Sequence, residues 1–331
     1  MKRLVLGIDG GGTKTQCALY DINGNELDIV DWGPTNHELL KGGYRGLKME
    51  LAILTNFILK KHGINLAQIK KGVFGMAGVD TKEQHSTVSG ILREIGFEDF
   101  LLCNDAYLGI KAGSPCGYGI GVVNGTGCSV AGIDRSGRRF QIGGQGNLTG
   151  DLGGGVYLGE QVIRAVYDYF FRCGEYTVLK ELLPKALNTA SKYEFMDNVR
   201  EKLDKGEINV ADLNRLVFEG AKRGDGISVG LLEAVGSSLA ASVNGMIREL
   251  QFDREQSVTI VLTGSINTRG SSPELINRIK RDVVTANKDT DIKLVLLDRP
   301  PVVGAVIWAA EGLADKRQVD EVFFAEALKY A

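Results

Sequence analysis

The sequence has no long hydrophobic run. The apolar stretch after Met1-Lys2-Arg3 ends at Asp9, which is too short for the core of a signal peptide. The longest late run, residues 301–310, has about half the length needed to cross a bilayer. These absences predict a cytoplasmic protein without a membrane partner.

The chain also lacks a large net charge, and its cysteines lack the spacing that is typical of metal sites. The net charge of −2 gives no reason to expect nucleic acid or an acidic membrane surface as a partner. No C-x-x-C pair and no metal-ligand spacing occur among the five cysteines, which are Cys17, Cys103, Cys116, Cys128 and Cys173. A scattered, odd set of this kind is typical of reduced thiols, and most are expected to be small core residues.

Glycine, in contrast, is abundant: the chain has 44, concentrated in a few loops. Glycine lets a backbone approach a ligand closely. In the first loop, residues 7–15, a Walker A motif would need lysine in place of Thr13, and a dinucleotide fingerprint would need glycine in place of Thr15. Residues 15–20 predict a strand, so the loop joins two strands. An anion would be held there by backbone N–H groups and by the hydroxyls of Thr13 and Thr15.

The same arrangement occurs again more than 100 residues later. Residues 119–134 read as a strand, a Gly125-Thr126-Gly127 turn and a second strand. Ser136-Gly137 then supplies a hairpin turn, as Asn23-Gly24 does after the first loop. One such loop alone would be better interpreted as a turn. Two copies predict a duplicated domain and favour phosphate binding between the two halves.

The stretches between the loops alternate between helix and strand patterns. Helices are expected at 44–61, 80–96 and 302–313, and strands at 72–79, 100–103, 257–262 and 292–297. Residues 160–250 read as mainly helical. Asp80 followed by Glu83 predicts a capping box at the second helix. Asn104-Asp105 lies at the C-terminal end of a strand, where ligands collect over an open α/β sheet.

Several motifs occur in a characteristic order, namely Asp9-Gly-Gly-Gly-Thr13, Asn36-His37, Asn104-Asp105, Gly125-Thr-Gly127, Gly150-Asp151 and Leu262-Thr-Gly264. With them the chain resembles the N-acetylglucosamine kinase branch of the BadF/BadG/BcrA/BcrD-type ATPase family, in the actin-like ATPase superfamily. The resemblance covers nearly the whole chain. It implies an α/β fold of two ribonuclease-H-like domains with an inter-domain cleft that holds sugar and ATP.

The implied domains are residues 1–113 and 114–331. The second would carry the helical insertion at about 160–250, and a C-terminal helix at about 315–331 would pack back on the first. The resemblance also implies a homodimer.

The resemblance implies a role for each motif as well. Asp105 would be the general base on the sugar hydroxyl, and Asp9 would lie near Mg²⁺ and the phosphates. The expected sugar contacts are Asn36, Asp105, Cys128, Ser129, Gly144, Gln145, Gly146 and Asp151. The expected ATP contacts are Gly11, Gly12, Thr13, Lys14, Gly125, Thr126, Gly127, Gly264 and Ser265.

Several of these residues also have a plainer interpretation. Asp105 and Asp151 could cap helices, and Asp9 and Asn36 could be turn or loop residues. Lys14 is better interpreted as a solvated strand residue than as a phosphate ligand. Cys128 is interpreted as a small residue lining the cleft, not as a nucleophile.

The predicted function is an ATP-dependent amino-sugar kinase. Relatives tend to have Gly-Trp-Gly at 144–146 and Gly-Asp-Glu-Gly-Ser at 150–154, where this chain has Gln145, Leu152 and Gly154. These departures leave open whether the sugar is N-acetylglucosamine, glucosamine or N-acetylmuramate. One alternative is an activator ATPase for a reductase, although the cysteines lack an obvious pair to hold its iron–sulfur cluster. Another is a sugar-responsive regulator, although the chain begins at its first strand, with no room for a DNA-binding module.

Overall fold

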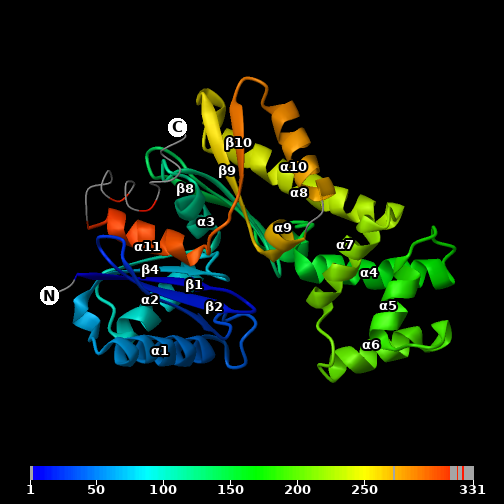
Figure 1. Cartoon of the computed structure of the whole chain (residues 1–331), viewed down its shortest axis with the longest axis horizontal. Helices are drawn as coiled ribbons and strands as arrows, with labels where there is room; N and C mark the ends of the chain where they lie inside the picture. The colour runs from blue at the N-terminus through cyan, green and yellow to red at the C-terminus, as the bar shows by residue number, and fades with distance from the viewer. Residues whose placement is uncertain (1–2, 271–272, 314–318, 320–322, 324–331) are drawn as a thin grey trace.

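The computed structural model describes residues 3–270 and 273–313, together with Val319 and Phe323. The chain first builds one five-stranded sheet, in the order β3-β2-β1-β4-β5 (Figure 1). Its strands are β1 (Leu4–Gly10), β2 (Thr15–Asp21), β3 (Glu26–Trp32), β4 (Ile69–Met76) and β5 (Phe100–Cys103). β1 pairs antiparallel with β2 and parallel with β4.

A second five-stranded sheet repeats this plan, in the order β10-β9-β6-β7-β8. Its strands are β6 (Gly119–Asn124), β7 (Cys128–Ile133), β8 (Arg139–Gly143), β9 (Ser257–Thr263) and β10 (Asp291–Leu296). β6 pairs antiparallel with β7 and parallel with β9, as β1 does with β2 and β4. The two sheets therefore share one topology, which confirms the predicted duplication.

Helices α1 (Gly43–His62) and α2 (Lys82–Ile95) cover the outer face of the first sheet. On α1 the apolar side chains recur at helical spacing, and Leu47, Leu51, Leu54 and Ile58 are buried. They pack against alternate residues of β1, namely Leu4, Leu6 and Ile8. Side chains of a strand alternate between its two faces, so Val5 points to the opposite side.

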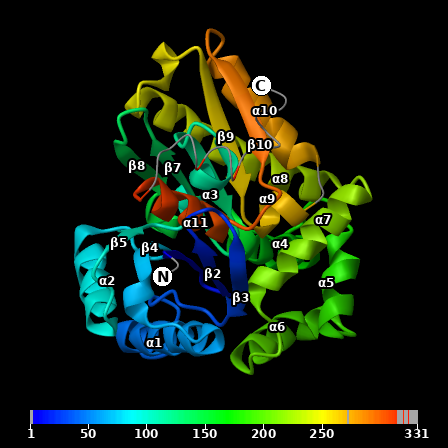
Figure 2. The ribbon, with the colours of Figure 1, turned by 60° about the vertical axis from the view of Figure 1, so that its left-hand side comes forward.

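That opposite face is covered by α3 (Ala106–Gly113) and α11 (Val302–Glu311), which lie between the two sheets in both views (Figures 1 and 2). Their shared cluster joins Val5 of β1, Leu108 of α3, Ala131 of β7 and Val306 of α11. Lys111 of α3 and Glu311 of α11 form a largely buried ion pair of 2.7 Å. The two helices are thus the main apolar link between the sheets.

The position of α11 differs from the expected division of the chain. The sequence assigns residues 302–313 to the second domain, whereas the structure packs α11 on β1, β2 and β4 of the first sheet. The helix expected at about 315–331 lies outside the described residues, apart from Val319 and Phe323. The boundary between 113 and 114, in the link from α3 to β6, stays a prediction.

A helical insertion separates β8 from β9 and extends away from the first sheet (Figure 1). It consists of α4 (Gly154–Phe171), α5 (Leu179–Leu187), α6 (Phe195–Asp204), α7 (Asn214–Lys222) and α8 (Gly226–Glu249). Two further helices follow β9, α9 (Ser265–Arg269) and α10 (Pro273–Ala286). Short 3₁₀ turns lie at Leu66–Gln68, Gly146–Leu148, Lys192–Glu194, Val210–Leu213 and Phe252–Arg254.

Within the described ranges, α8 is the one helix long and apolar enough to cross a membrane by length and composition. In the structure it packs along α10 and α7 and contacts the second sheet. Leu232, Val235, Leu239 and Val243 are among its buried residues. Its apolar composition is therefore explained by its place in the core of the second half.

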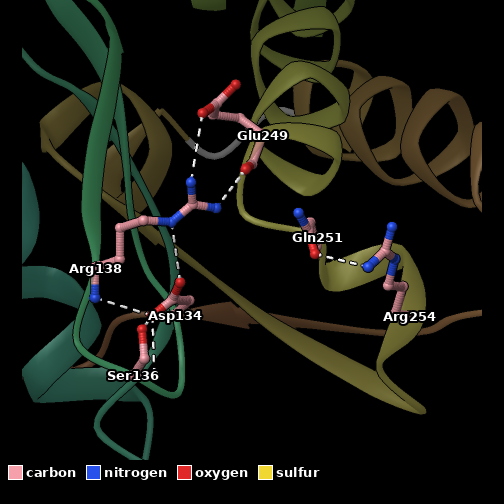
Figure 3. Close-up of polar contacts among 6 residues, drawn as sticks. All are labelled: Asp134, Ser136, Arg138, Glu249, Gln251 and Arg254. Carbon is pink, nitrogen blue, oxygen red and sulfur yellow. Dashed lines mark hydrogen bonds and ion pairs between the residues drawn. The ribbon is translucent and has the colours of Figure 1, made fainter.

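The C-terminal end of α8 is tied to the hairpin between β7 and β8 (Figure 3). Arg138 donates from Nη2 to the backbone oxygen of Glu249 at 2.6 Å and from Nε to Asp134 Oδ2 at 3.2 Å. Asp134 also accepts from Ser136 and so holds the predicted hairpin turn. A cation near the last carbonyls complements the negative end of a helix. This cluster fixes the edge of the second sheet to α8.

The close contact between α3 and α11 generates a stability prediction. A Cβ atom on Gly304 would lie 2.0 Å from the backbone oxygen of Leu108, so Gly304→Ala must push the two helices apart. We expect a loss of about 1–3 kcal/mol, the usual cost of overpacking. Gly230→Ala on α8, where a Cβ meets nothing within 4 Å, is the matched control and should not destabilise. Equal urea midpoints for Gly304→Ala and the parent would contradict this packing.

Candidate active site

The two glycine–threonine loops meet. Each is a tight turn closed by its own backbone, Gly11 N donating to Lys14 O at 3.0 Å and Gly125 N to Gly127 O at 2.9 Å. Between them, Thr13 Oγ1 and Thr126 Oγ1 lie 3.0 Å apart and form a hydrogen bond. The structure thus brings together the two loops that the sequence predicts to hold phosphate.

The first loop is held by residues that follow β3 in the same half of the chain. The carbonyl oxygen of Gly11 accepts from the backbone N–H groups of Thr35 and Asn36, at 3.1 and 3.2 Å. This places the predicted sugar contact Asn36 beside the loop. Thr15 corrects one expectation: it is fully buried and its hydroxyl bonds Thr35 Oγ1 at 2.8 Å, so it is not available to an anion.

The second loop is held by the start of α4. Gly155 N donates to Gly125 O at 2.7 Å, and Val156 N donates to Thr126 O at 3.2 Å. The side chain of Asn124, at the end of β6, accepts from Gly154 N at 2.7 Å and donates to Asn267 Oδ1 at 3.2 Å. These bonds fix the loop to both α4 and α9.

Gly264 lies beside this same arrangement. It has φ of 85°, and a Cβ atom there would lie 2.4 Å from the backbone oxygen of Asn124. Only glycine suits that conformation and that approach. Sequence reasoning singled out Gly264 but missed Asn124 and Asn267, since a single asparagine in a strand or helix carries no motif.

A pocket of about 340 Å³ opens next to Gly264, between α7 and α9. It is lined by Asn214, Arg215, Phe218, Glu219, Lys222, Ser265, Ile266, Arg269 and Gly270. An aromatic ring with polar and cationic side chains around it suits a flat heterocycle attached to a phosphate chain. The pocket lies where the resemblance puts the adenosine.

Asp9 and Asp105 lie at one edge of the first sheet, where the parallel strands β1 and β5 end. Asp105 is the N-cap residue of α3, yet its side chain makes no capping hydrogen bond. The plainer interpretation of Asp105 as a helix cap therefore does not hold. Neither carboxylate has an ion-pair partner among the described residues.

Burial sets the protonation of this pair. It raises the pKa of Asp105 to about 7, and the negative charges of Asp9 and Asp80 add to the effect. It also raises the pKa of Asp9 to about 6, opposed by the positive charge of Lys14. Lys14 itself is exposed and lies 3.9 Å from Asp31, as expected for a solvated residue. A carboxylate with a pKa near neutrality is suited to accept a proton.

The expected sugar loop is shaped by Asp151. Its Oδ2 accepts from Gln145 N at 3.0 Å, Gly146 N at 2.9 Å and Thr149 Oγ1 at 2.8 Å. The N-cap of α4 is Gly153, so Asp151 does not cap that helix. Asp151 holds the loop in its turn and leaves Oδ1, near Gly143, less engaged.

Two more expected sugar contacts line the same region from β7. A Cβ atom on Gly144 would lie 3.6 Å from that of Ser129, so the sugar loop rests on this strand. Burial raises the pKa of Cys128 to about 12, which makes this thiol a poor nucleophile, as expected.

Asp80 and Gln141 are residues that sequence reasoning missed. Asp80 does not cap α2 with Glu83, because Thr81 accepts from Gln84 N at 3.2 Å and Gln84 reaches back to Thr81 N at 2.8 Å. Asp80 Oδ1 instead accepts from Asn104 Nδ2 at 2.9 Å and from Gln141 Nε2 at 2.6 Å. The second bond joins the two sheets across 61 positions, and no local pattern announces it.

The carboxylate of Asp9 fits a magnesium ion that is bound together with phosphate. The described residues hold no group of three His, Cys, Asp or Glu side chains placed to bind a metal by themselves. Mg²⁺ typically takes one or two carboxylates, keeps several waters and shares its remaining sites with substrate phosphates. Asp9, partly exposed and without an ion pair among the described residues, offers such an oxygen beside the first loop.

Two sheets of identical topology, with glycine–threonine loops that face each other, define a two-domain protein of the actin-like ATPase fold. The chain belongs to the BadF/BadG/BcrA/BcrD ATPase family, whose sequence pattern matches residues 6–309.

The chain is also similar to named relatives and to a solved structure. The chain is 28% identical to a Dictyostelium discoideum protein named N-acetyl-D-glucosamine kinase, over 84% of this chain and 90% of that protein. It is 30% identical to an N-acetylmuramic acid/N-acetylglucosamine kinase of Clostridium acetobutylicum, over 80% and 86%. A crystal structure from Chromobacterium violaceum, described as a proposed N-acetylglucosamine kinase, has the same fold, with a TM-score of 0.69 at 18% identity over 92% and 98%.

The raised pKa of Asp105 predicts a stability change in Asp105→Asn. The pKa of Asp105 is raised from 3.8 to about 7 in the folded chain, so the ionised side chain disfavours folding most above pH 7. The variant should melt at a higher temperature than the parent at pH 8. The difference should shrink toward pH 5, because the folded parent then carries the proton. A variant that melts at or below the parent at pH 8 would contradict the burial of this charge.

Proposed function

We propose that the protein is an ATP-dependent kinase of amino sugars. It would phosphorylate N-acetylglucosamine or a close relative such as glucosamine or N-acetylmuramate. The observations that carry the proposal are the meeting of the loops at Thr13 and Thr126 and the position of Asp9 and Asp105 at the C-terminal ends of β1 and β5. The activities named for the two relatives support the same chemistry.

The residues divide the work of an in-line phosphoryl transfer. The backbone N–H groups and hydroxyls of loops 11–14 and 125–127 would hold the ATP phosphates, since such turns form anion-binding concavities. Asp105 would accept the proton of the sugar hydroxyl as the new bond to phosphorus forms. Asn36, Ser129, Asp151 and the loop 143–146 would hold the sugar, since short amide, hydroxyl and carboxylate groups suit neighbouring hydroxyls.

Mg²⁺ would be held by Asp9 together with the phosphates, and when bound it would neutralise part of their charge. The adenosine would occupy the pocket between α7 and α9 beside Gly264 and Ser265. Phe218 offers that pocket its aromatic surface.

The activator-ATPase alternative is less well supported than the kinase. Such a protein needs cysteines gathered at an interface. Here Cys17 and Cys103 are buried in the first half, whereas Cys116 and Cys173 are exposed on different parts of the second. We also propose a cytoplasmic location, which suits five free thiols, and a homodimer, which rests on the family resemblance alone.

The proposed reaction predicts ADP release that depends on both an amino sugar and Mg²⁺. A coupled ADP assay over a sugar panel should give turnover with N-acetylglucosamine or one of its relatives. Asp105→Asn keeps the shape but not the base, so kcat should fall by about 10²–10⁴-fold.

Cys116→Ser, an exposed change in the link between α3 and β6, is the control and should retain full turnover. No ADP release with any amino sugar would overturn the proposed function. Full activity of Asp105→Asn would overturn the role of Asp105 alone.

The proposed adenosine pocket predicts a separate effect on ATP. Ser265 is exposed at the pocket rim, so Ser265→Trp should fill the space and raise KM for ATP while KM for the sugar changes little. Lys280→Trp on the exposed side of α10 places the same bulk away from the pocket and should leave both values unchanged. An unchanged KM for ATP in Ser265→Trp would exclude this pocket as the nucleotide site.

A further inference from the structure

One carboxylate joins the two halves of the chain beside the candidate sugar loop. Asp80 follows β4 of the first sheet, and Gln141 lies on β8 of the second, opposite Ala131. Asp80 Oδ1 accepts from Gln141 Nε2 at 2.6 Å and from Asn104 Nδ2 at 2.9 Å. The α2 helix is capped by Thr81 and Gln84, so capping does not account for this carboxylate.

The bond to Asn104 extends to the candidate base. Asn104 is 5% exposed, and its Oδ1 accepts from Ala106 N, the first residue of α3, at 2.9 Å. The amide of Asn104 therefore has both ends engaged, with the nitrogen toward Asp80 and the oxygen toward α3. Because Asp105 lies between Asn104 and Ala106, this pair of bonds holds its backbone on both sides.

The bond to Gln141 extends to the candidate sugar loop. Gly143 and Gly144 follow Gln141 closely and have φ of 75° and 87°, so the chain turns sharply there. A Cβ atom on Gly144 would lie 3.0 Å from Gln141 Nε2 and 3.5 Å from Asp80 Oδ1. The loop therefore starts directly over the Asp80–Gln141 bond.

We propose that Asp80 is a positioning residue for phosphoryl transfer, which holds Asp105 through Asn104 and the sugar loop 143–146 through Gln141. This proposal rests on the proposed function, in which Asp105 and the sugar loop act on the same sugar. A single acceptor atom shared by donors from both sheets fixes the distance between base and sugar loop. A misplacement of about 1 Å in such a site can cost about 100-fold in rate.

The kinetic test compares three variants. Asp80→Ala removes the acceptor and should lower kcat for the sugar by about 100-fold, with KM for ATP within about two-fold of the parent. Asp80→Asn keeps an oxygen for both amides and should rank between the parent and Asp80→Ala, since a neutral acceptor is weaker. Gln141→Met keeps shape without a donor. Its effect on kcat should not add to that of Asp80→Ala, because Asp80→Ala already removes the bond that Gln141 donates.

The control is Thr81→Ala in the same loop, which removes the cap of α2 but leaves Asp80 in place. It should lower the thermal midpoint and leave kcat within about two-fold of the parent, as expected for an N-cap away from the reacting groups. If Thr81→Ala lowers kcat as much as Asp80→Ala does, or if the effects of Asp80→Ala and Gln141→Met simply add, the proposal is overturned.

Hydrogen exchange tests the positioning without turnover. In Asp80→Ala, backbone amides of 104–108 and 141–146 should both exchange faster than in Thr81→Ala, because both segments lose their shared anchor. Unchanged exchange in either segment overturns the proposal whatever the activity. If the variants exchange as expected but the parent phosphorylates no amino sugar, the proposed function is overturned instead.

Discussion

The hydroxyl contact between Thr13 and Thr126 is the constraint on which the rest of the site depends. It exists because each half of the chain folds the same way, with a turn between its first two antiparallel strands. When two such halves face each other, their turns meet. The first turn alone matches neither a Walker A motif nor a dinucleotide fingerprint, because Thr13 and Thr15 stand where a lysine and a glycine would be needed. Together the two turns surround one space with backbone N–H groups and hydroxyls.

Asp9 and Asp105 place acidic groups in the same half of the chain as the first loop, which is unfavourable when both are ionised. Burial raises the pKa of Asp9 and of Asp105, and the negative charge of Asp9 further disfavours ionisation of Asp105. Ionised acidic groups with raised pKa values lower the stability of the fold. The apolar packing of α3 and α11 between the sheets offsets this cost, and such a trade between stability and activity is usual for active sites.

Much of this was predictable from the sequence, for definite physical reasons. Strand and helix periods placed most elements, and the repeated loops predicted the duplication and the cleft. The failures concern long-range contacts. Thr15 looked available, yet Thr35 of a distant segment engages its hydroxyl. Asp80 looked like a cap, yet its partners lie on β5's end and on β8. The packing of α11 on the first sheet likewise depends on tertiary contacts that leave no local signal.

A crystal structure with a non-hydrolysable ATP analogue, Mg²⁺ and N-acetylglucosamine would show whether both loops hold one nucleotide. We expect phosphate oxygens within hydrogen-bond distance of backbone N–H groups in both 11–13 and 125–127, with a sugar hydroxyl facing Asp105. Phosphates bound by one loop only, or bound outside the cleft while Thr13 and Thr126 stay in contact, would contradict this expectation.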